Sequence, residues 1–196
     1  MQSIYFVDSN FTYESSKKSI LSIRYATDGF SFCVHDETEK LVVFVHEPYA
    51  ADSREAVVAK LKNYVVNDTI LNLRFKKVYI MPCFKEKLLV PGAFFDKANI
   101  ATLYTVNQEV SPDDTILYHH IEGIEAYLVE TVISSFHDFV REHFPVVQIV
   151  NGAYPFILGA MSKALRDTEQ IFLDIQDNYF DLLFIRDSGI QLFNTF

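Results

Sequence analysis

The feature that most limits the possible folds is a pattern of three short apolar strands that occurs twice, about 150 residues apart. An Asp28-Gly29 pair between two of the strands is typical of a β-hairpin. The predicted strands are residues 20–24, 30–35 and 41–45 in the first copy, and residues 171–175, 179–185 and 190–193 in the second. The similar composition of residues 30–34 and 180–184 favours an internal duplication over two unrelated meanders, which any β-rich protein could contain.

Between the two copies, helical and strand patterns alternate. Asp52, with Glu55 three residues later, predicts a helix whose N-cap is Asp52. Residues 78–81 are apolar without alternation, which is typical of a parallel strand buried on both faces. Further strands are predicted at residues 88–90, 115–118, 126–129 and 146–150, and further helices at about residues 94–104, 132–140 and 156–164. This order predicts an α/β or α+β protein with a mixed sheet.

Composition excludes several classes of protein. With 196 residues, 49% of them apolar, the chain is not a disordered tail. Its net charge of −9 argues against nucleic acid as a partner, because binding phosphates needs a clustered basic surface. No apolar run approaches the roughly 20 residues of a membrane-spanning helix, and no signal peptide is recognisable. Cys33 and Cys83 are expected to be buried, reduced thiols, so we predict a cytoplasmic protein without membrane insertion.

Three short motifs resemble a family of uncharacterised Bacteroidetes proteins. They are Gly29-Phe30-Ser31-Phe32-Cys33-Val34, Leu89-Val90-Pro91 before Phe94-Phe95-Asp96, and Leu192-Phe193-Asn194-Thr195-Phe196. The resemblance covers most of the chain from about residue 19. It implies the actin-like ATPase fold, a ribonuclease H-like fold shared with PilM and FtsA. We therefore expect a full first lobe at residues 1–168, with a small subdomain inserted near residues 88–129. Residues 169–196 would be the first three strands of a second lobe, truncated at Phe196.

In the actin-like superfamily, the first hairpin of each lobe carries an acidic residue and glycines. The glycines let backbone N–H groups approach phosphates, and the acid organises Mg²⁺. In the first copy here, Arg24 stands at the position of the acid, and Tyr25-Ala26 stands where the glycine turn begins. The first hairpin is therefore predicted to have lost its phosphate site.

The second hairpin keeps an acid, Asp174, but Gln176 replaces the glycine and Tyr179 adds bulk. Side chains at these positions block close approach of the backbone to a phosphate, so phosphoryl transfer should be lost. Asp174, Asp177 and Asn178 are the remaining candidates for binding a nucleotide. For Asp174 we prefer the role of an acid that stabilises the turn, and a ligand of Mg²⁺ is the alternative.

No other catalytic or metal-binding motif was recognised, so no catalytic residue and no metal ligands are predicted. His119 and His120 are adjacent on a predicted strand and should point to opposite faces. The sequence therefore favours a scaffold that does not hydrolyse nucleotide and binds a protein partner or a second copy of itself, with no cofactor. The alternative is an ATP-binding switch or ATPase, using ATP and Mg²⁺, whose site is completed beyond residue 196.

Overall fold

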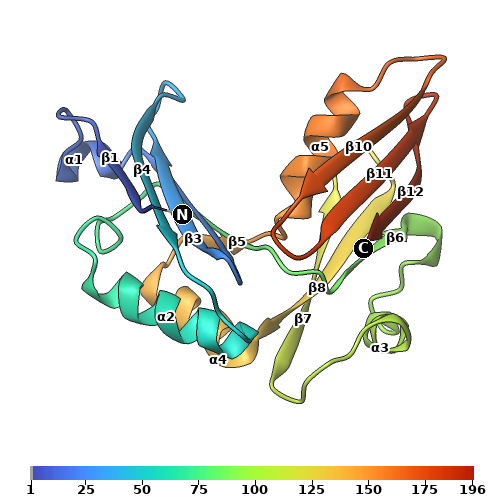
Figure 1. Cartoon of the computed structure of the whole chain (residues 1–196), viewed down its shortest axis with the longest axis horizontal. Coiled ribbons are helices and arrows are strands. Elements are labelled where there is room, and N and C mark those ends of the chain that lie inside the picture. Colours follow the sequence, from blue (N-terminus) through green and yellow to red (C-terminus); the bar gives the residue numbers. More distant parts are fainter. Residues whose placement is uncertain (1) are drawn as a thin grey trace. The chain divides into compact units, whose positions relative to one another are not determined.

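The computed structural model describes residues 2–196 and divides the chain into two compact units. The first unit contains the chain up to Cys83 and the segment Ile133–Val150; the second contains Phe84–Val132 and Asn151–Phe196 (Figure 1). The boundaries predicted for the two lobes, at residues 168 and 169, stay a prediction. None of the helices within residues 2–196 combines the length and hydropathy that crossing a membrane requires.

The first unit is built on a mixed sheet of six strands in the order β1-β4-β3-β2-β5-β9. The strands are β1 (Ile4–Val7), β2 (Ile20–Ala26), β3 (Gly29–His35), β4 (Leu41–Pro48), β5 (Lys77–Pro82) and β9 (Val147–Ile149). β5 runs parallel to β2 and β9, as predicted. The prediction that β5 is buried on both faces is wrong, because burial alternates along it: Val78 and Ile80 are buried, whereas Tyr79 and Met81 are partly exposed.

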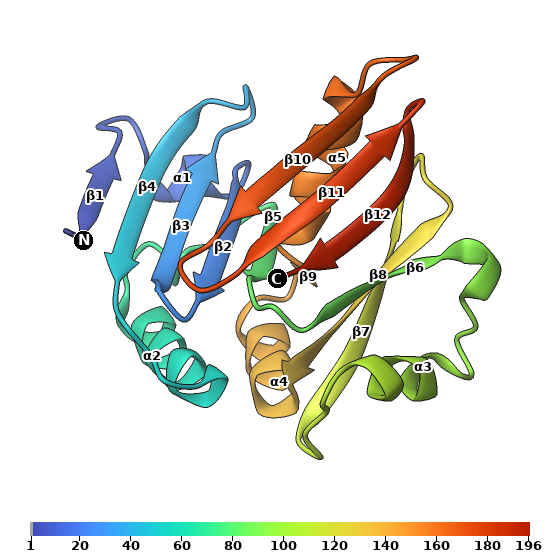
Figure 2. The same ribbon diagram turned by 45° about the vertical axis from the view of Figure 1, so that its right-hand side comes forward.

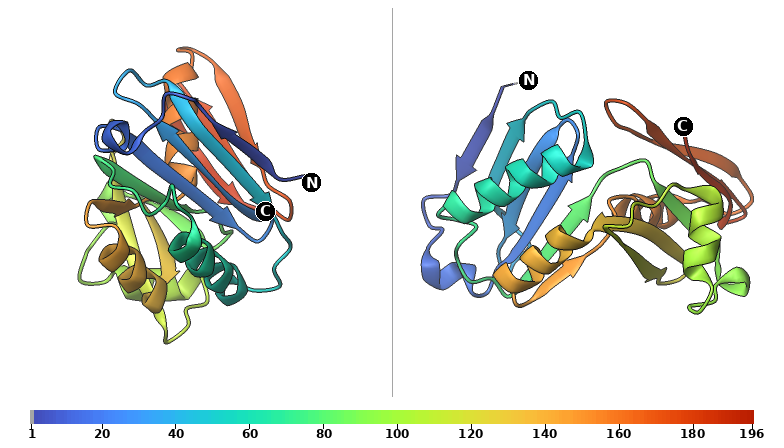
Figure 3. Two further views of the ribbon diagram at one scale, coloured as in Figure 1. Left: turned by 90° about the vertical axis from the view of Figure 1, so that its left-hand side faces the viewer. Right: turned by 90° about the horizontal axis from the view of Figure 1, so that it is seen from below.

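Helices α2 (Arg54–Asn67) and α4 (Ser134–His143) lie on one face of this sheet, as seen from below in Figure 3. α2 brings the ring of Tyr64 to 4.5 Å from that of Phe30, and α4 brings Phe136 to 5.0 Å from Tyr25. A short helix, α1 (Tyr13–Ser16), follows β1. The buried residues of α2 are Val57, Val58, Leu61 and Val65, so the helix packs on the sheet through its apolar side chains.

The N-cap of α2 is Ser53, so the prediction of Asp52 is wrong by one residue. Ser53 has extended backbone angles, and its Oγ accepts a hydrogen bond of 3.2 Å from the N–H of Ala56. A side chain at the N-cap satisfies one of the unpaired amides of the first turn. Asp52 lies one residue too early to do so, because the helix begins at Arg54.

The second unit contains a three-stranded sheet in which β8 lies between β6 and β7. Its elements are β6 (Lys87–Pro91), η1 (Gly92–Phe94), α3 (Ile100–Asn107), β7 (Asp114–Ile121) and β8 (Ala126–Ile133). The single helix predicted at residues 94–104 is interrupted: Phe95 is extended, and its ring stacks on Tyr127 at 3.6 Å. β8 continues to Ile133, so the helix predicted to include Val132 and Ile133 begins only at Ser134.

The rest of the second unit consists of α5 (Ala153–Lys163) and an antiparallel meander of β10 (Glu169–Ile175), β11 (Phe180–Arg186) and β12 (Gly189–Thr195). Figure 2 shows α5 directly behind the meander. Ile157 of α5 packs with Leu183 and Ile185 of β11 and with Leu128 of β8, forming one buried apolar cluster. We call the face of the meander that packs on α5 its inner face, and the opposite face its outer face.

The two meanders share their strand register. Tyr25 pairs with Phe30 across the first hairpin, and Ile175 pairs with Phe180 across the second, each residue 150 positions from its counterpart. The second pairing of each meander is irregular at matching positions, directly after Val34 and directly after Phe184. Because a register slip of one residue would reverse every side chain, these coincidences support the interpretation of an internal duplication.

Candidate functional site

The first hairpin turn is occupied by the chain's own groups. Two nitrogens of the Arg24 guanidinium lie 3.3 and 3.4 Å from the two carboxylate oxygens of Asp28. The residue at the predicted position of the acid is therefore paired with the acid of the turn itself. Gly29 has a φ of +139°, and a Cβ there would collide with the carbonyl oxygen of Glu47. This glycine permits close approach of β4, which is a structural requirement independent of any ligand.

The second hairpin turn separates the three residues predicted from the sequence. The backbone N–H of Gln176 donates to the carbonyl of Tyr179 at 2.9 Å, and its side-chain amide donates to Asp174 Oδ2 at 3.0 Å. Asp174 is partly buried, whereas Asp177 and Asn178 are exposed in the loop. Asp174 thus bonds within its own turn, and the roles predicted for Asp174, Asp177 and Asn178 stay predictions.

A buried ion pair lies beside Asp174. Asp181 is the cross-strand partner of Asp174, and its Oδ1 lies 2.9 Å from the Nζ of Lys87 on β6. The side chains of Lys87 and Asp181 are only 1% and 2% exposed. Thr195 of β12 donates its hydroxyl to Asp181 at 2.6 Å. β6 thus meets β11 and β12, which are far from it in the sequence, at one buried carboxylate.

The Lys87 ammonium is enclosed by further groups. It donates to the carbonyl of Phe84 at 2.9 Å and lies 4.5 Å from the ring centroid of Tyr179. Tyr179, predicted to fill the space of a phosphate, in fact covers a cation. Burial raises the pKa of Asp181, and the Asp174 carboxylate raises it further, whereas Lys87 and Thr195 lower it. The ammonium is therefore the main charge that compensates for burying this carboxylate.

Neither Lys87 nor Asp181 was among the predicted site residues. A signal for each is present in the sequence: Lys87 begins an apolar strand, and Asp181 interrupts Phe-Asp-Leu-Leu-Phe at a position that alternation turns inward. A charged residue at such a position requires a partner. The identity of that partner follows only from the tertiary structure.

A second buried polar cluster ties β8 to α5. Glu130 is buried and accepts a hydrogen bond of 2.7 Å from Asn151 Nδ2, while Asn151 Oδ1 accepts from the N–H of Ala153 at 2.8 Å. His119 Nε2 lies 3.8 Å from Glu130 Oε1, and burial lowers the pKa of His119. His120 instead contacts Tyr127 and is exposed, which fits the prediction that the two histidines point apart.

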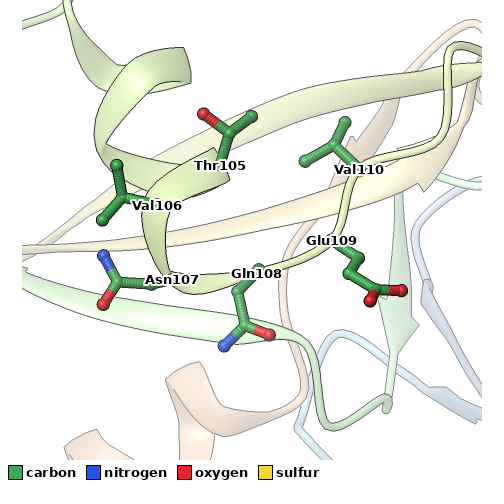
Figure 4. A pocket seen from close by; sticks show the side chains of 6 residues that line it. All are labelled: Thr105, Val106, Asn107, Gln108, Glu109 and Val110. Atoms are coloured by element: carbon green, nitrogen blue, oxygen red, sulfur yellow. The ribbon is translucent and has the colours of Figure 1, made fainter.

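Two surface pockets of the second unit contain few chemically reactive side chains. A pocket of about 540 Å³ at the end of α3 is lined by one continuous segment, residues 105–110. Figure 4 shows that these side chains fan outward from the turn. A pocket of about 310 Å³ adjoins the ion pair and is lined in part by Lys85, Lys87 and Phe196.

Within residues 2–196, no three His, Cys, Asp or Glu side chains are grouped as ligands for a metal ion. Cys33 and Cys83 form no disulfide and are only partly buried, so the expectation that both thiols are buried is wrong.

Comparison with known proteins identifies both a sequence family and a fold. The family described as "Protein of unknown function (DUF3822)" matches residues 8–196. A crystal structure from Bacteroides thetaiotaomicron, described as a protein with an actin-like ATPase fold and unknown function, matches with a TM-score of 0.87 and 22% identity. The match covers 95% of this chain and 72% of that protein. The predicted actin-like ATPase fold is thereby confirmed. No functionally curated protein matches significantly.

Two more distant structures complete the comparison. The PilM-PilN type IV pilus biogenesis complex matches with a TM-score of 0.47 and 11% identity, over 90% of this chain and 60% of that one. MreB5 of Spiroplasma citri bound to ADP matches with a TM-score of 0.38 and 10% identity, over 92% of this chain and 52% of that one. The chain therefore spans little more than half the length of these two proteins.

Proposed function

The chain belongs to the DUF3822 family of proteins of unknown function, and on that premise we propose that it is a protein-interaction or assembly scaffold that does not hydrolyse nucleotide. The observation that carries this proposal is the buried ion pair between Lys87 of β6 and Asp181 of the second hairpin. The ammonium and the hydroxyl of Thr195 already bind Asp181, the carboxylate that lies opposite the retained acid Asp174 across the second hairpin.

The electrostatics of the second hairpin support this proposal. A Mg²⁺ ion beside Asp181 would have to displace Lys87 or tolerate a cation within a few ångströms, and repulsion between cations at such a distance is strong where both are buried. Tyr179 lies over the ammonium, so a phosphate reaching this position would also have to displace the ring. These residues therefore do not fit a Mg²⁺–triphosphate group.

The first hairpin supports the same conclusion. Arg24 and Asp28 neutralise each other at the turn. The carbonyls of Thr27 and Asp28 accept hydrogen bonds from Ala51 and Tyr49, which closes the turn against the following segment. Phosphoryl transfer depends on positioning and on compensation of charge, and the charged groups Arg24, Asp28 and Asp181 are already paired within the chain. A protein partner or a second copy of the chain then becomes the natural ligand, and two cysteines outside any disulfide are in keeping with a cytoplasmic location.

Thermal unfolding with and without 5 mM Mg·ATP tests the proposal, together with a measurement of phosphate release. We expect the same melting temperature in both conditions and no release above the buffer rate. A ligand at 100 times its Kd would add about 2.7 kcal/mol, which corresponds to a rise of several degrees for a chain of this size. Such a rise with Mg·ATP and not with Mg·AMP would favour the ATP-binding switch instead.

A further inference from the structure

We infer that Glu130 and His119 together bind one proton in the folded chain, and that this proton makes the stability of the second unit depend on pH. The site is the buried polar cluster that ties β8 to the start of α5. This inference goes beyond the proposed function, because it holds for a scaffold and for an ATPase alike.

The buried charges of the second unit do not balance. Among residues 2–196, three charged residues are buried, namely the cation Lys87 and the acids Glu130 and Asp181. They are neighbours: Lys87 and Glu130 are cross-strand partners on β6 and β8, and Lys87 Nζ lies 2.9 Å from Asp181 Oδ1. With both acids ionised, this cluster would contain one negative charge in excess. An ionisable group in such a position binds a proton and becomes neutral.

The hydrogen bonds of the cluster indicate which acid requires the proton. The ammonium of Lys87 lies within hydrogen-bonding distance of Asp181 and also donates to the carbonyl of Phe84. Glu130 Oε2 instead accepts a hydrogen bond of 2.7 Å from Asn151 Nδ2, which is a neutral donor. A neutral donor stabilises a carboxylate less than a charged one does. Glu130 is therefore the acid that holds the proton.

His119 supplies the second half of the site. Its Nε2 is buried, lies 3.8 Å from Glu130 Oε1 and forms no hydrogen bond with any other group in the described part of the chain. Burial lowers the pKa of His119, which favours the neutral ring, and a neutral imidazole accepts a hydrogen bond at one nitrogen. A proton on Glu130 thus has an acceptor in His119. The histidine side chain is 19% exposed, so it also connects the carboxyl group with solvent.

The groups that surround the pair leave the excess charge uncompensated. The residues two positions away on β7 and β8 belong to the apolar cluster formed with α5, which includes Ile121, Leu128, Ala153 and Ile157. Tyr154 of α5 packs against the same cluster, and its phenol is not a cation in either protonation state. The charged groups on the neighbouring strands are Lys87 of β6 and, beyond it, Asp181 of β11.

The bound proton fixes the sign of the pH dependence. In an unfolded chain, a glutamate is ionised above about pH 4.3, and a histidine loses its proton near pH 6.5. Above about pH 6.5, the folded pair holds a proton that the unfolded chain has released. The unfolding equilibrium constant therefore rises with pH, by up to about tenfold per pH unit, until the pair itself is deprotonated.

Glu130→Gln tests the inference, because glutamine needs no proton to be neutral. Urea denaturation of the full chain, followed by circular dichroism, gives the unfolding constant at pH 6.5 and pH 8.5. The ratio of the native constant to that of Glu130→Gln should rise at least about tenfold over this range. Glu122→Gln, at an exposed acid in the turn between β7 and β8, is the matched control and should give a constant ratio. A constant ratio for Glu130→Gln as well would overturn the inference.

A second measurement needs no variant and decides the question if Glu130→Gln does not fold. In the native chain, the ¹³C shift of the Glu130 carboxyl and the ¹⁵N shifts of the His119 ring report which group holds a proton. At pH 7 we expect a proton on one of the two groups. An ionised Glu130 together with a neutral His119 at pH 7 would overturn the inference.

Discussion

At the scale of single residues, the most consequential contact is the one between Lys87 and Asp181. Both side chains are almost fully buried, and burying charges costs more than an ordinary hydrogen bond returns. The pair is supported by Thr195 and by the carbonyl of Phe84, which satisfy additional hydrogen-bonding capacity of the two groups. The pair is thus a structural link between β6 and β11.

Replacing Lys87 by Met tests this link. We expect the free energy of unfolding to fall by about 3–5 kcal/mol, because Asp181 is left as an uncompensated buried charge. Lys85→Met, at an exposed lysine two residues earlier, should change it by less than about 0.5 kcal/mol. The measurement is urea denaturation at pH 7. A loss for Lys87→Met no greater than that of the control would contradict the structural role.

The same variant should show a specific dependence on pH. The pKa of Asp181 in the folded chain already lies above its ordinary value of 3.8, and removing Lys87 should raise it further. A carboxyl group with a raised pKa favours the folded state at low pH, and this contribution is lost as the pH rises through the folded pKa. The difference in unfolding free energy between the native chain and Lys87→Met should therefore narrow from pH 7 to pH 4. A difference that is independent of pH would contradict this assignment.

At the scale of elements, the two meanders are alike in register and unlike in what covers them. Burial alternates along β2 and β3, and the buried side chains lie on the face covered by α2 and α4. In β10 the corresponding residues are exposed. Alternation of apolar and polar residues within a segment is enough to predict a strand. How much the apolar side chains stabilise the fold depends on whether a helix or another sheet packs on them.

A matched pair of substitutions measures this difference. Ile23→Ala should lower the free energy of unfolding by about 2–5 kcal/mol, because Ile23 is fully buried beneath helices. Leu173→Ala, at the corresponding position of the second meander, should cost less than about 1 kcal/mol, because half of that side chain is already in water. Both values come from urea denaturation followed by circular dichroism. Equal losses would mean that the outer face is covered in solution.

At the scale of the whole molecule, the six-stranded sheet has a graded order of burial. β2 lies between β3 and β5 and contains fully buried residues such as Leu21 and Ile23. β1 lies at the end of the sheet, where it pairs with β4, and most of its side chains are exposed. The free energy of local opening differs in the same way within a folded chain, so strands at the edge of a sheet open more readily than strands at its centre.

Native-state hydrogen exchange should reveal this gradient. Amides of β2 are expected to exchange only through global unfolding, whereas those of β1 should exchange at least about 100-fold faster through local opening. Peptide-resolved mass spectrometry separates the two strands. Equal protection of β1 and β2 would show that another chain covers the exposed edge of β1.

The sequence by itself determined the order and type of most elements, including both meanders, the parallel strand β5 and the main helices. These features arise from periodicities of 2 and 3.6 residues, which reside within single segments. The sequence also determined that Asp174 remains on the second hairpin while the glycines are absent. β1 was not predicted, because four residues that are mostly exposed become a strand only through pairing with β4.

Only the tertiary structure decided which distant residues meet and which faces are covered. Lys87 and Asp181 are 94 positions apart, and their contact depends on how β6 and β11 pack rather than on any local pattern. In the same way, equal apolar patterns on two meanders lead to a buried face in one and an exposed face in the other. Whether a side chain is buried depends on the layer that packs against its segment, and the sequence of the segment alone does not specify that layer.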